Sequence, residues 1–140
     1  MKKISIIYWS GTGNTEAMAK LIAEGAKESG AEVVVKSVSE ASVTDVQNSD
    51  VIALGCPAMG ESIKTTDMET FVSSTQKAIK GKKIALFGSY DWGTGEWILD
   101  WRSRMVSYGA NLINYGLNIC GAPEGVTADE CTKLGKQLAR

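Results

Sequence analysis

Apolar positions along the chain fall into short runs that alternate with stretches of helical periodicity. The short runs are rich in β-branched and aromatic residues, which is typical of buried strands. They cover residues 4–9, 33–38, 51–56, 84–88 and 111–119. After the first run, Met18, Leu21, Ile22 and Gly25 recur at helical spacing, and Gly30 stands where a helix commonly ends. The pattern therefore predicts five strands that alternate with helices.

The other helices are predicted to differ in length. Residues 41–49 leave room only for a short helix, and a longer one is expected from about Thr66 to Ile79. Behind the fourth strand, Trp97 and Trp101 are four apart on a predicted helix and are expected to pack in the core. The segment Thr127–Glu130 has the form of a capping box and predicts the start of a last helix. The side chains expected inside that helix are Cys131, Leu134 and Leu138.

Strands that are apolar on both faces predict a parallel sheet covered by helices on both sides. Short connections with right-handed crossovers then favour a doubly wound α/β fold. Neither a repeat nor a linker divides the 140 residues, so we expect a single domain over residues 1–140.

Composition excludes several classes of protein. With 15 basic and 16 acidic residues, the chain lacks the overall positive charge of a nucleic-acid-binding protein. It has no histidine, which rules out Ser-His and Cys-His catalysis. The spacing of Cys56, Cys120 and Cys131 fits neither a disulfide framework nor a zinc site, so reduced and mostly buried thiols are expected. No signal peptide and no membrane-spanning run is recognised, and we expect a cytoplasmic protein.

Three strand ends carry unusual loops, at residues 10–15, 57–62 and 89–95. Ligands of open parallel sheets bind at the carboxyl ends of the strands. The first loop combines glycines, hydroxyls and a helix N-terminus, which is a chemistry suited to phosphate. It lacks the lysine of the nucleoside-triphosphate loop and the third glycine of the dinucleotide motif. Met59, Tyr90 and Trp92 stand among glycines in the other two loops and are candidates to flank a flat ring, whereas Tyr8 and Trp9 are expected to pack.

These loops, taken in order, resemble those of short-chain flavodoxins over essentially the whole chain. The matching segments are residues 8–16, 54–60 and 85–93. The resemblance implies a flavodoxin-like five-stranded sheet in the order 2-1-3-4-5 and a non-covalently bound FMN, with Met59 and Trp92 on the two faces of the isoalloxazine. The positions that match the family's FMN-binding residues are Ser10, Gly11, Thr12, Gly13, Asn14, Thr15, Pro57, Ala58, Met59, Gly60, Glu61, Gly88, Ser89, Tyr90, Asp91, Trp92 and Gly93.

The resemblance also implies a low-potential one-electron carrier, not an enzyme. In the family, a glycine peptide at the position of Gly60 flips to stabilise the semiquinone, and only glycine easily adopts the positive φ required. Residues 57–72 and 91–100 contain six carboxylates and one lysine. Such an acidic rim disfavours the anionic hydroquinone and attracts redox proteins with basic docking patches, such as ferredoxin-type oxidoreductases and reductases. No nucleic acid or membrane partner is expected, and a monomer is.

Two positions depart from the family pattern, and two other functions compete. Asp91 stands where relatives commonly have glycine, and Ser62 where some have a glutamate that contacts the flavin.

A small FMN-dependent NAD(P)H:quinone or nitro reductase would need a substrate pocket in addition to the cofactor site. A phosphorylation switch on the same fold would need an acidic pair after the first strand, where this chain has Trp9 and Ser10.

Overall fold

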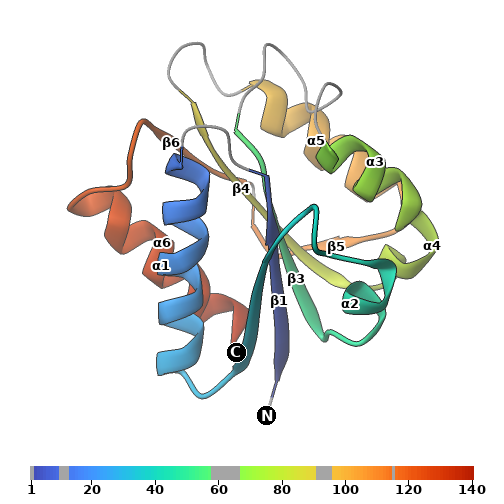
Figure 1. Ribbon diagram of the computed structural model, residues 1–140, viewed down its shortest axis with the longest axis horizontal. Helices are drawn as coiled ribbons and strands as arrows, with labels where there is room; N and C mark the ends of the chain where they lie inside the picture. Colours follow the sequence, from blue (N-terminus) through green and yellow to red (C-terminus); the bar gives the residue numbers. More distant parts are fainter. Residues whose placement is uncertain (1, 10–12, 58–66, 91–95, 115) are drawn as a thin grey trace.

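The computed structural model describes residues 2–9, 13–57, 67–90, 96–114 and 116–140. A twisted parallel sheet forms the centre, and helices cover both of its faces (Figure 1). The strands are β1 (Lys3–Tyr8), β2 (Glu32–Ser37), β3 (Val51–Gly55), β4 (Lys83–Tyr90), β5 (Asn111–Leu112) and β6 (Leu117–Cys120). The helices are α1 (Asn14–Glu28), α2 (Val43–Gln47), α3 (Asp67–Ser74), α4 (Gln76–Ile79), α5 (Glu96–Ser107) and α6 (Val126–Leu138).

The order of the strands is β2-β1-β3-β4-β5, which confirms the predicted doubly wound topology. Every described pairing is parallel, and Ile6 of β1 pairs with Val35 of β2 on one side and with Ala53 of β3 on the other. The chain therefore changes its direction of winding between β1 and β3. In this fold, that is the place where a ligand site forms at the carboxyl ends of the strands.

Each face of the sheet carries its own hydrophobic core. Ile4 and Ile6 pack with α1 and α6 on one face, and Ile7 belongs to the cluster that includes α3 and α5 on the other. Trp97 and Trp101 are buried in the second cluster, as predicted. The expectation that every strand is apolar on both faces is wrong for β2, where Val34 is 43% exposed because β2 is an edge strand.

Glycines allow α1 and α6 to pack unusually close together. A Cβ placed on Gly25 would lie 2.1 Å from the Thr132 carbonyl oxygen, and one placed on Gly135 would lie 2.0 Å from that of Ile22. A real Cβ cannot approach a backbone atom so closely, so these positions exclude larger residues. The last helix begins at Val126 behind Gly125, and the Thr127 hydroxyl bonds to the Glu124 backbone. The predicted capping box is therefore wrong.

Three other predicted boundaries need correction. The third helix breaks at Thr75, whose buried hydroxyl bonds to the Val72 carbonyl oxygen. Strand β4 extends to Tyr90, since β6 pairs with residues 87–90. The fifth strand is split into β5 and β6, and between them the Asn114 amide bonds to both the N–H and the carbonyl oxygen of Leu86. The Asn114 side chain thus makes the hydrogen bonds with Leu86 that the backbone of a continuous strand would otherwise make.

Within the described part of the chain, no helix combines the length and hydropathy needed to cross a membrane.

Candidate functional site

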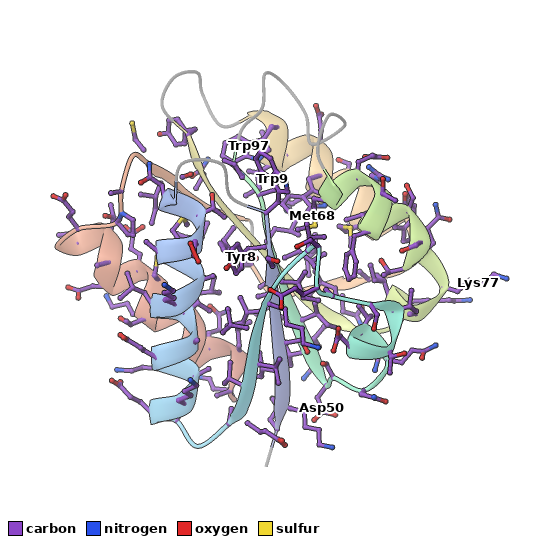
Figure 2. All side chains as sticks on the ribbon, viewed as in Figure 1. Tyr8, Trp9, Asp50, Met68, Lys77 and Trp97 are labelled. Atoms are coloured by element: carbon purple, nitrogen blue, oxygen red, sulfur yellow. The ribbon has the colours of Figure 1, made fainter. Side chains whose placement is uncertain are left out.

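The carboxyl ends of β1, β3 and β4 meet at one edge of the sheet, which we call the cofactor edge. The Trp9 N–H donates to the Gly55 carbonyl oxygen at 2.9 Å, and the Cys56 N–H donates to that of Phe87 at 3.1 Å. These bonds continue the strand pairing one residue beyond β1 and β3. Figure 2 shows Trp9 and Trp97 near this edge and Asp50 at the opposite one. The three strands that precede the unusual loops of the sequence analysis therefore end side by side.

Helix α1 begins at this edge behind a glycine. Gly13 precedes the helix with φ +95°, a left-handed conformation that favours glycine, and no side chain caps the helix there. Its carbonyl oxygen accepts the first helical bond, from the Ala17 N–H at 3.0 Å. The N–H groups of a helix's first turn have no acceptor inside the helix, and the dipole makes this end positive. The start of α1 is thus suited to an anion.

A buried hydrogen bond joins the start of α1 to the end of β4. The Thr15 and Ser89 hydroxyl oxygens are 2.9 Å apart, and the Ser89 N–H lies 3.4 Å from the Thr15 oxygen. Thr15 is fully buried and Ser89 is nearly so. Both positions were predicted as site residues, but their contact with each other was not. It fixes the predicted phosphate-binding segment relative to the strand that leads to residues 91–93.

Close packing between β3 and β4 shapes the same edge. A Cβ on Gly88 would lie 2.1 Å from the Cys56 carbonyl oxygen and 3.0 Å from the Trp97 ring. The Trp97 indole N–H donates to that carbonyl oxygen at 3.3 Å. The ring of Tyr90 packs against Trp97 at a tilt, with ring centroids 5.9 Å apart. Tyr90 therefore contributes to packing as well as standing at the site.

Tyr8 and Glu16 form a link that the sequence analysis missed. The Tyr8 hydroxyl donates to Glu16 Oε2 at 2.9 Å, and Lys20 Nζ lies 4.0 Å from the same oxygen. Burial raises the pKa of Tyr8, and the negative charges of Glu16 and Glu40 raise it further. The sequence signal was a tyrosine at the end of a strand, eight positions before a carboxylate in the first turn of a helix. The link ties the two ends of residues 9–15 together.

The structure places some of the predicted site residues and leaves others undescribed. Gly13, Asn14, Thr15, Pro57, Gly88, Ser89 and Tyr90 all belong to the cofactor edge. Outside the described residues lie Ser10, Gly11, Thr12, Ala58, Met59, Gly60, Glu61, Ser62, Asp91, Trp92 and Gly93. Of the cysteines, Cys56 and Cys131 are buried, in line with the expectation of mostly buried thiols, and Cys120 is exposed. In the described part of the chain, no group of three metal-ligating side chains forms.

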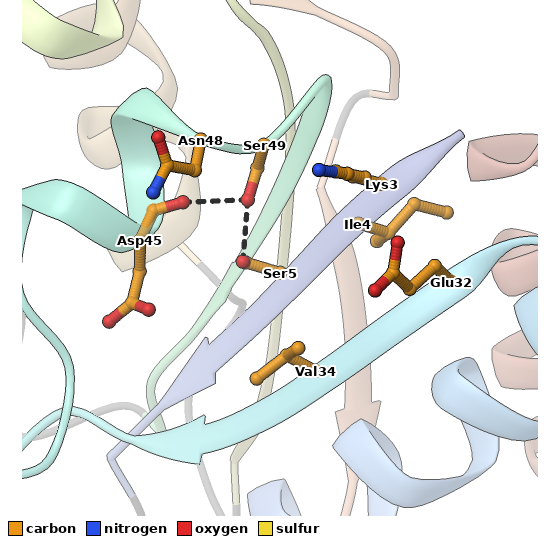
Figure 3. A pocket seen from close by; sticks show the side chains of 8 residues that line it. All are labelled: Lys3, Ile4, Ser5, Glu32, Val34, Asp45, Asn48 and Ser49. Carbon is orange, nitrogen blue, oxygen red and sulfur yellow. Dashed lines mark hydrogen bonds between the residues drawn. The ribbon is translucent and has the colours of Figure 1, made fainter. Parts of the chain in front are cut away.

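A small hollow at the opposite edge of the sheet is separate from this site (Figure 3). It has a volume of about 120 Å³ and lies between the starts of β1 and β2 and the end of α2. Its polar centre is satisfied within the protein, since Ser49 donates to the Asp45 carbonyl oxygen at 2.6 Å and shares a 2.6 Å bond with Ser5. Nothing in its geometry calls for a ligand.

Comparison with known proteins identifies the family. The sequence profile of the flavodoxins matches residues 6–135. The chain is 42% identical to a flavodoxin of Clostridium beijerinckii, covering 97% of this chain and 99% of that protein. It is 44% identical to one of Megasphaera elsdenii, covering 98% of each. The chain belongs to the flavodoxin family. The solution structure of the two-electron reduced Megasphaera elsdenii flavodoxin superimposes with a TM-score of 0.88 over 97% of this chain and 98% of that one.

Flavodoxins bind FMN and carry electrons; they are not enzymes. The donors at the described cofactor edge fit this cofactor. The start of α1 offers main-chain N–H groups beside Gly13, which suits a phosphate group. Gly88 lets β3 and β4 lie close together immediately before the segment expected to contact the ring. The described start of α1 therefore agrees with an FMN phosphate, and most residues expected to contact the ring lie outside the described residues.

Proposed function

We propose that this flavodoxin is a low-potential one-electron carrier whose FMN cycles between the semiquinone and the hydroquinone. The observation that carries the proposal is the charge of the cofactor edge. Its described residues, 8–9, 13–16, 56–57 and 87–90, contain no lysine or arginine, and they include Glu16. FMN brings its own phosphate charge to this edge. No lysine or arginine of these segments offsets the phosphate charge. Adding a further electron to the cofactor is therefore disfavoured, which lowers its reduction potential.

The residues proposed to hold FMN divide into two groups. Ser10, Gly11, Thr12, Gly13, Asn14 and Thr15 bind the phosphate through hydroxyls and main-chain N–H groups. Residues 57–61 and 88–93 bind the ring, with Met59 and Trp92 on its two faces and Gly60 providing the peptide that responds to reduction. The Thr15–Ser89 bond links the two groups inside the protein, because Thr15 belongs to the first group and Ser89 to the second. This link supports a single site made from both groups.

The proposed partners are redox proteins with basic docking patches. Glu16 lies at the described edge, and we propose that the carboxylates of residues 57–72 and 91–100 add to a negative field at this end, apart from Glu69, which pairs with Arg104. Such a field raises association rates with basic surfaces, and the effect weakens as salt screens it. We propose that the protein acts as a cytoplasmic monomer.

A reductive titration of the FMN-loaded protein tests the proposal. Dithionite is added in steps while the visible absorbance spectrum is recorded. A long-wavelength band that rises and then falls supports a stabilised one-electron state. Direct bleaching without that band would indicate two-electron chemistry, as expected of a reductase, and would overturn the proposal. Failure to retain FMN would overturn the assignment of the site itself.

A charge variant sharpens the test. Glu16→Gln removes a carboxylate from the cofactor edge and is expected to raise the potential of the second one-electron step. Glu28→Gln is the matched control, since Glu28 lies at the far end of the same helix. Equal potentials in the two variants would contradict the electrostatic argument.

A further inference from the structure

A larger hollow lies at the amino edge of the sheet, at the end opposite the cofactor edge. Its volume is about 340 Å³. Lys2 precedes β1, Lys83 begins β4, and Arg140 follows the last turn of α6, so three separate elements bring their cations to its rim. Figure 1 shows both chain ends near this edge of the sheet. We call this place the amino-edge hollow.

In the part of the chain that the structure describes, no acidic side chain pairs with the three cations of the amino-edge hollow. No carboxylate side chain lines the hollow. Among the residues that the structure describes, no carboxylate lies within 4.0 Å of Lys2, Lys83 or Arg140, and no hydrogen bond engages their side-chain nitrogens. By contrast, the nearby Lys82 Nζ donates to the carbonyl oxygens of Gln47 and Ser49. No described acidic side chain therefore neutralises the side-chain cations of the rim.

The floor of the hollow is apolar. Leu112 ends the strand β5, Ile113 follows it, and the buried Leu138 comes from α6. The Gln137 amide donates to the Ile113 carbonyl oxygen at 3.2 Å, so one backbone acceptor at this edge is already engaged. Strand β5 is also only two residues long, which offers little backbone for an added strand. An apolar floor beneath a cationic rim complements a molecule with an apolar body and an anionic head.

We propose that the amino-edge hollow binds a small amphipathic anion, with its carboxylate or phosphate head among Lys2, Lys83 and Arg140. Its ring or short aliphatic chain lies over Leu112 and Ile113. The volume is at the lower end of the range for small-molecule sites, which favours such a ligand over a protein segment. Because the hollow is at the other end of the sheet, the anion binds without displacing the cofactor. The inference does not depend on the redox states proposed above.

Calorimetric titration of the FMN-loaded protein with octanoate tests the proposal, with amide NMR shifts to locate the binding. Saturable one-to-one binding is expected, with shifts centred on Ile113, Gln137 and Arg140. Octylammonium keeps the chain and reverses the charge, and acetate keeps the head and loses the chain; both are expected to bind at least about tenfold more weakly. Octyl phosphate, compared with octanoate, distinguishes a phosphate head from a carboxylate head.

Paired variants test the cationic rim directly. Lys83→Gln with Arg140→Gln is expected to weaken octanoate binding about tenfold, since two exposed charge contacts are lost. Lys27→Gln with Lys133→Gln is the control, because it removes two exposed cations of α1 and α6 that do not line the hollow. Bound FMN absorbance and circular dichroism verify that each variant is folded.

Several results would overturn the proposal. Octylammonium binding as tightly as octanoate would show that charge does not direct recognition. Unchanged affinity in the Lys83/Arg140 variant, or binding that never saturates, would show general adsorption to the surface. Binding of a polyglutamate peptide without binding of octanoate would replace the small-molecule site with a protein-docking surface.

Discussion

Thr15 and Ser89 are 74 positions apart in the sequence, yet their hydroxyl oxygens lie 2.9 Å apart inside the protein. Thr15 belongs to the first turn of α1 and Ser89 to the end of β4. The bond therefore connects the segment proposed to bind the phosphate to the strand that leads into the segment proposed to bind the ring. A substitution at one of the two residues should therefore affect the position of the other.

Replacing Thr15 by valine tests this coupling. Thr15→Val keeps the shape of the side chain and leaves the buried Ser89 hydroxyl without its partner, which costs about 1–3 kcal/mol of stability. We expect the free energy of unfolding in urea to fall by that amount and FMN binding to weaken. Thr44→Val is the control, since Thr44 is an exposed residue of the short helix α2. It should change stability by less than about 0.5 kcal/mol.

A double-mutant cycle separates this bond from other effects. Ser89→Ala combined with Thr15→Val should cost less than the sum of the single changes, because the partner hydroxyl is then removed as well. Strict additivity would mean that the two hydroxyls do not interact in solution.

Much of the cofactor edge could be predicted from local sequence. The Gly13-Asn14-Thr15 segment has its character because a glycine and hydroxyls stand between a strand and a helix, and that pattern is visible without a structure. The Thr15–Ser89 bond could not be predicted in this way. It depends on how far each element extends, and β4 continues two residues past the end of its apolar run at Gly88.

The other differences have similar physical causes. Asn111–Ile119 has the composition of one strand, but Asn114 uses its side-chain amide as a strand partner and Gly116 has φ +100°. A side chain that substitutes for backbone leaves no mark in hydrophobic periodicity. Thr75 likewise breaks the third helix by bonding to a carbonyl oxygen of its own turn. The split of the fifth strand and the break in the third helix therefore depend on hydrogen bonds of individual side chains, and the pattern of apolar positions does not show these bonds.

Gly88 should be intolerant of any side chain. In Gly88→Ala the new Cβ would meet the Cys56 carbonyl oxygen, a backbone atom that moves only if β3 and β4 separate. We expect a loss of about 2–3 kcal/mol, measured by urea unfolding, and weaker FMN binding. Gly81→Ala is the comparison, since Gly81 has φ +78° and open space around it. It should lose only about 1–2 kcal/mol, from backbone strain, and keep FMN affinity. Equal losses of stability and affinity would refute the steric argument.

The three thiols should differ sharply in reactivity. Cys120 is exposed, whereas Cys56 and Cys131 are buried. Burial raises the pKa of Cys131 to about 12, and the charge of Glu130 adds to the effect, so its reactive thiolate is scarce at neutral pH. Iodoacetamide at mildly alkaline pH should label Cys120 alone, as read by peptide mass spectrometry. Cys120→Ser should abolish labelling of the folded protein, and urea should expose the other two thiols. Rapid labelling of Cys131 in the folded state would contradict the burial argument.

Asp45 should make stability depend on pH in the acid range. Burial alone would raise the pKa of its carboxyl, but hydrogen bonds from Lys36 Nζ and the Ser42 N–H, with the charge of Lys36, lower it overall. A depressed pKa stabilises the fold above the unfolded value of about 3.9, and the contribution is lost as pH falls through the folded pKa. Asp45→Asn should therefore lose stability at neutral pH and show a shallower acid dependence in urea unfolding. Asp100→Asn, at an exposed position of α5, is the control and should change the free energy of unfolding at neutral pH by less than about 0.5 kcal/mol.

The ion pair between Arg104 and Glu69 should stabilise the arrangement of α3 and α5. Arg104 Nη1 bonds to Glu69 Oε2, and Nη2 lies 2.8 Å from Oε1, so the contact is bidentate. Both side chains are less than one-third exposed. Helix α3 begins after residues 57–61 and α5 begins after residues 88–93, the two segments expected to contact the ring. The pair therefore joins the helices behind both ring-binding segments.

Removing the Arg104 charge should affect stability and cofactor binding together. Arg104→Met with Glu69→Gln in a double-mutant cycle should give an interaction of about 1–2 kcal/mol, between the values for surface and buried pairs. The cycle is needed because Arg104 also donates to the Tyr108 hydroxyl at 2.7 Å and to that of Ser73 at 3.0 Å. Lys136→Met is the control, since the Lys136–Glu28 pair is 3.8 Å apart and more than half exposed. An interaction no larger than that of the control pair, with unchanged FMN affinity, would show that α3 and α5 keep their positions without this contact.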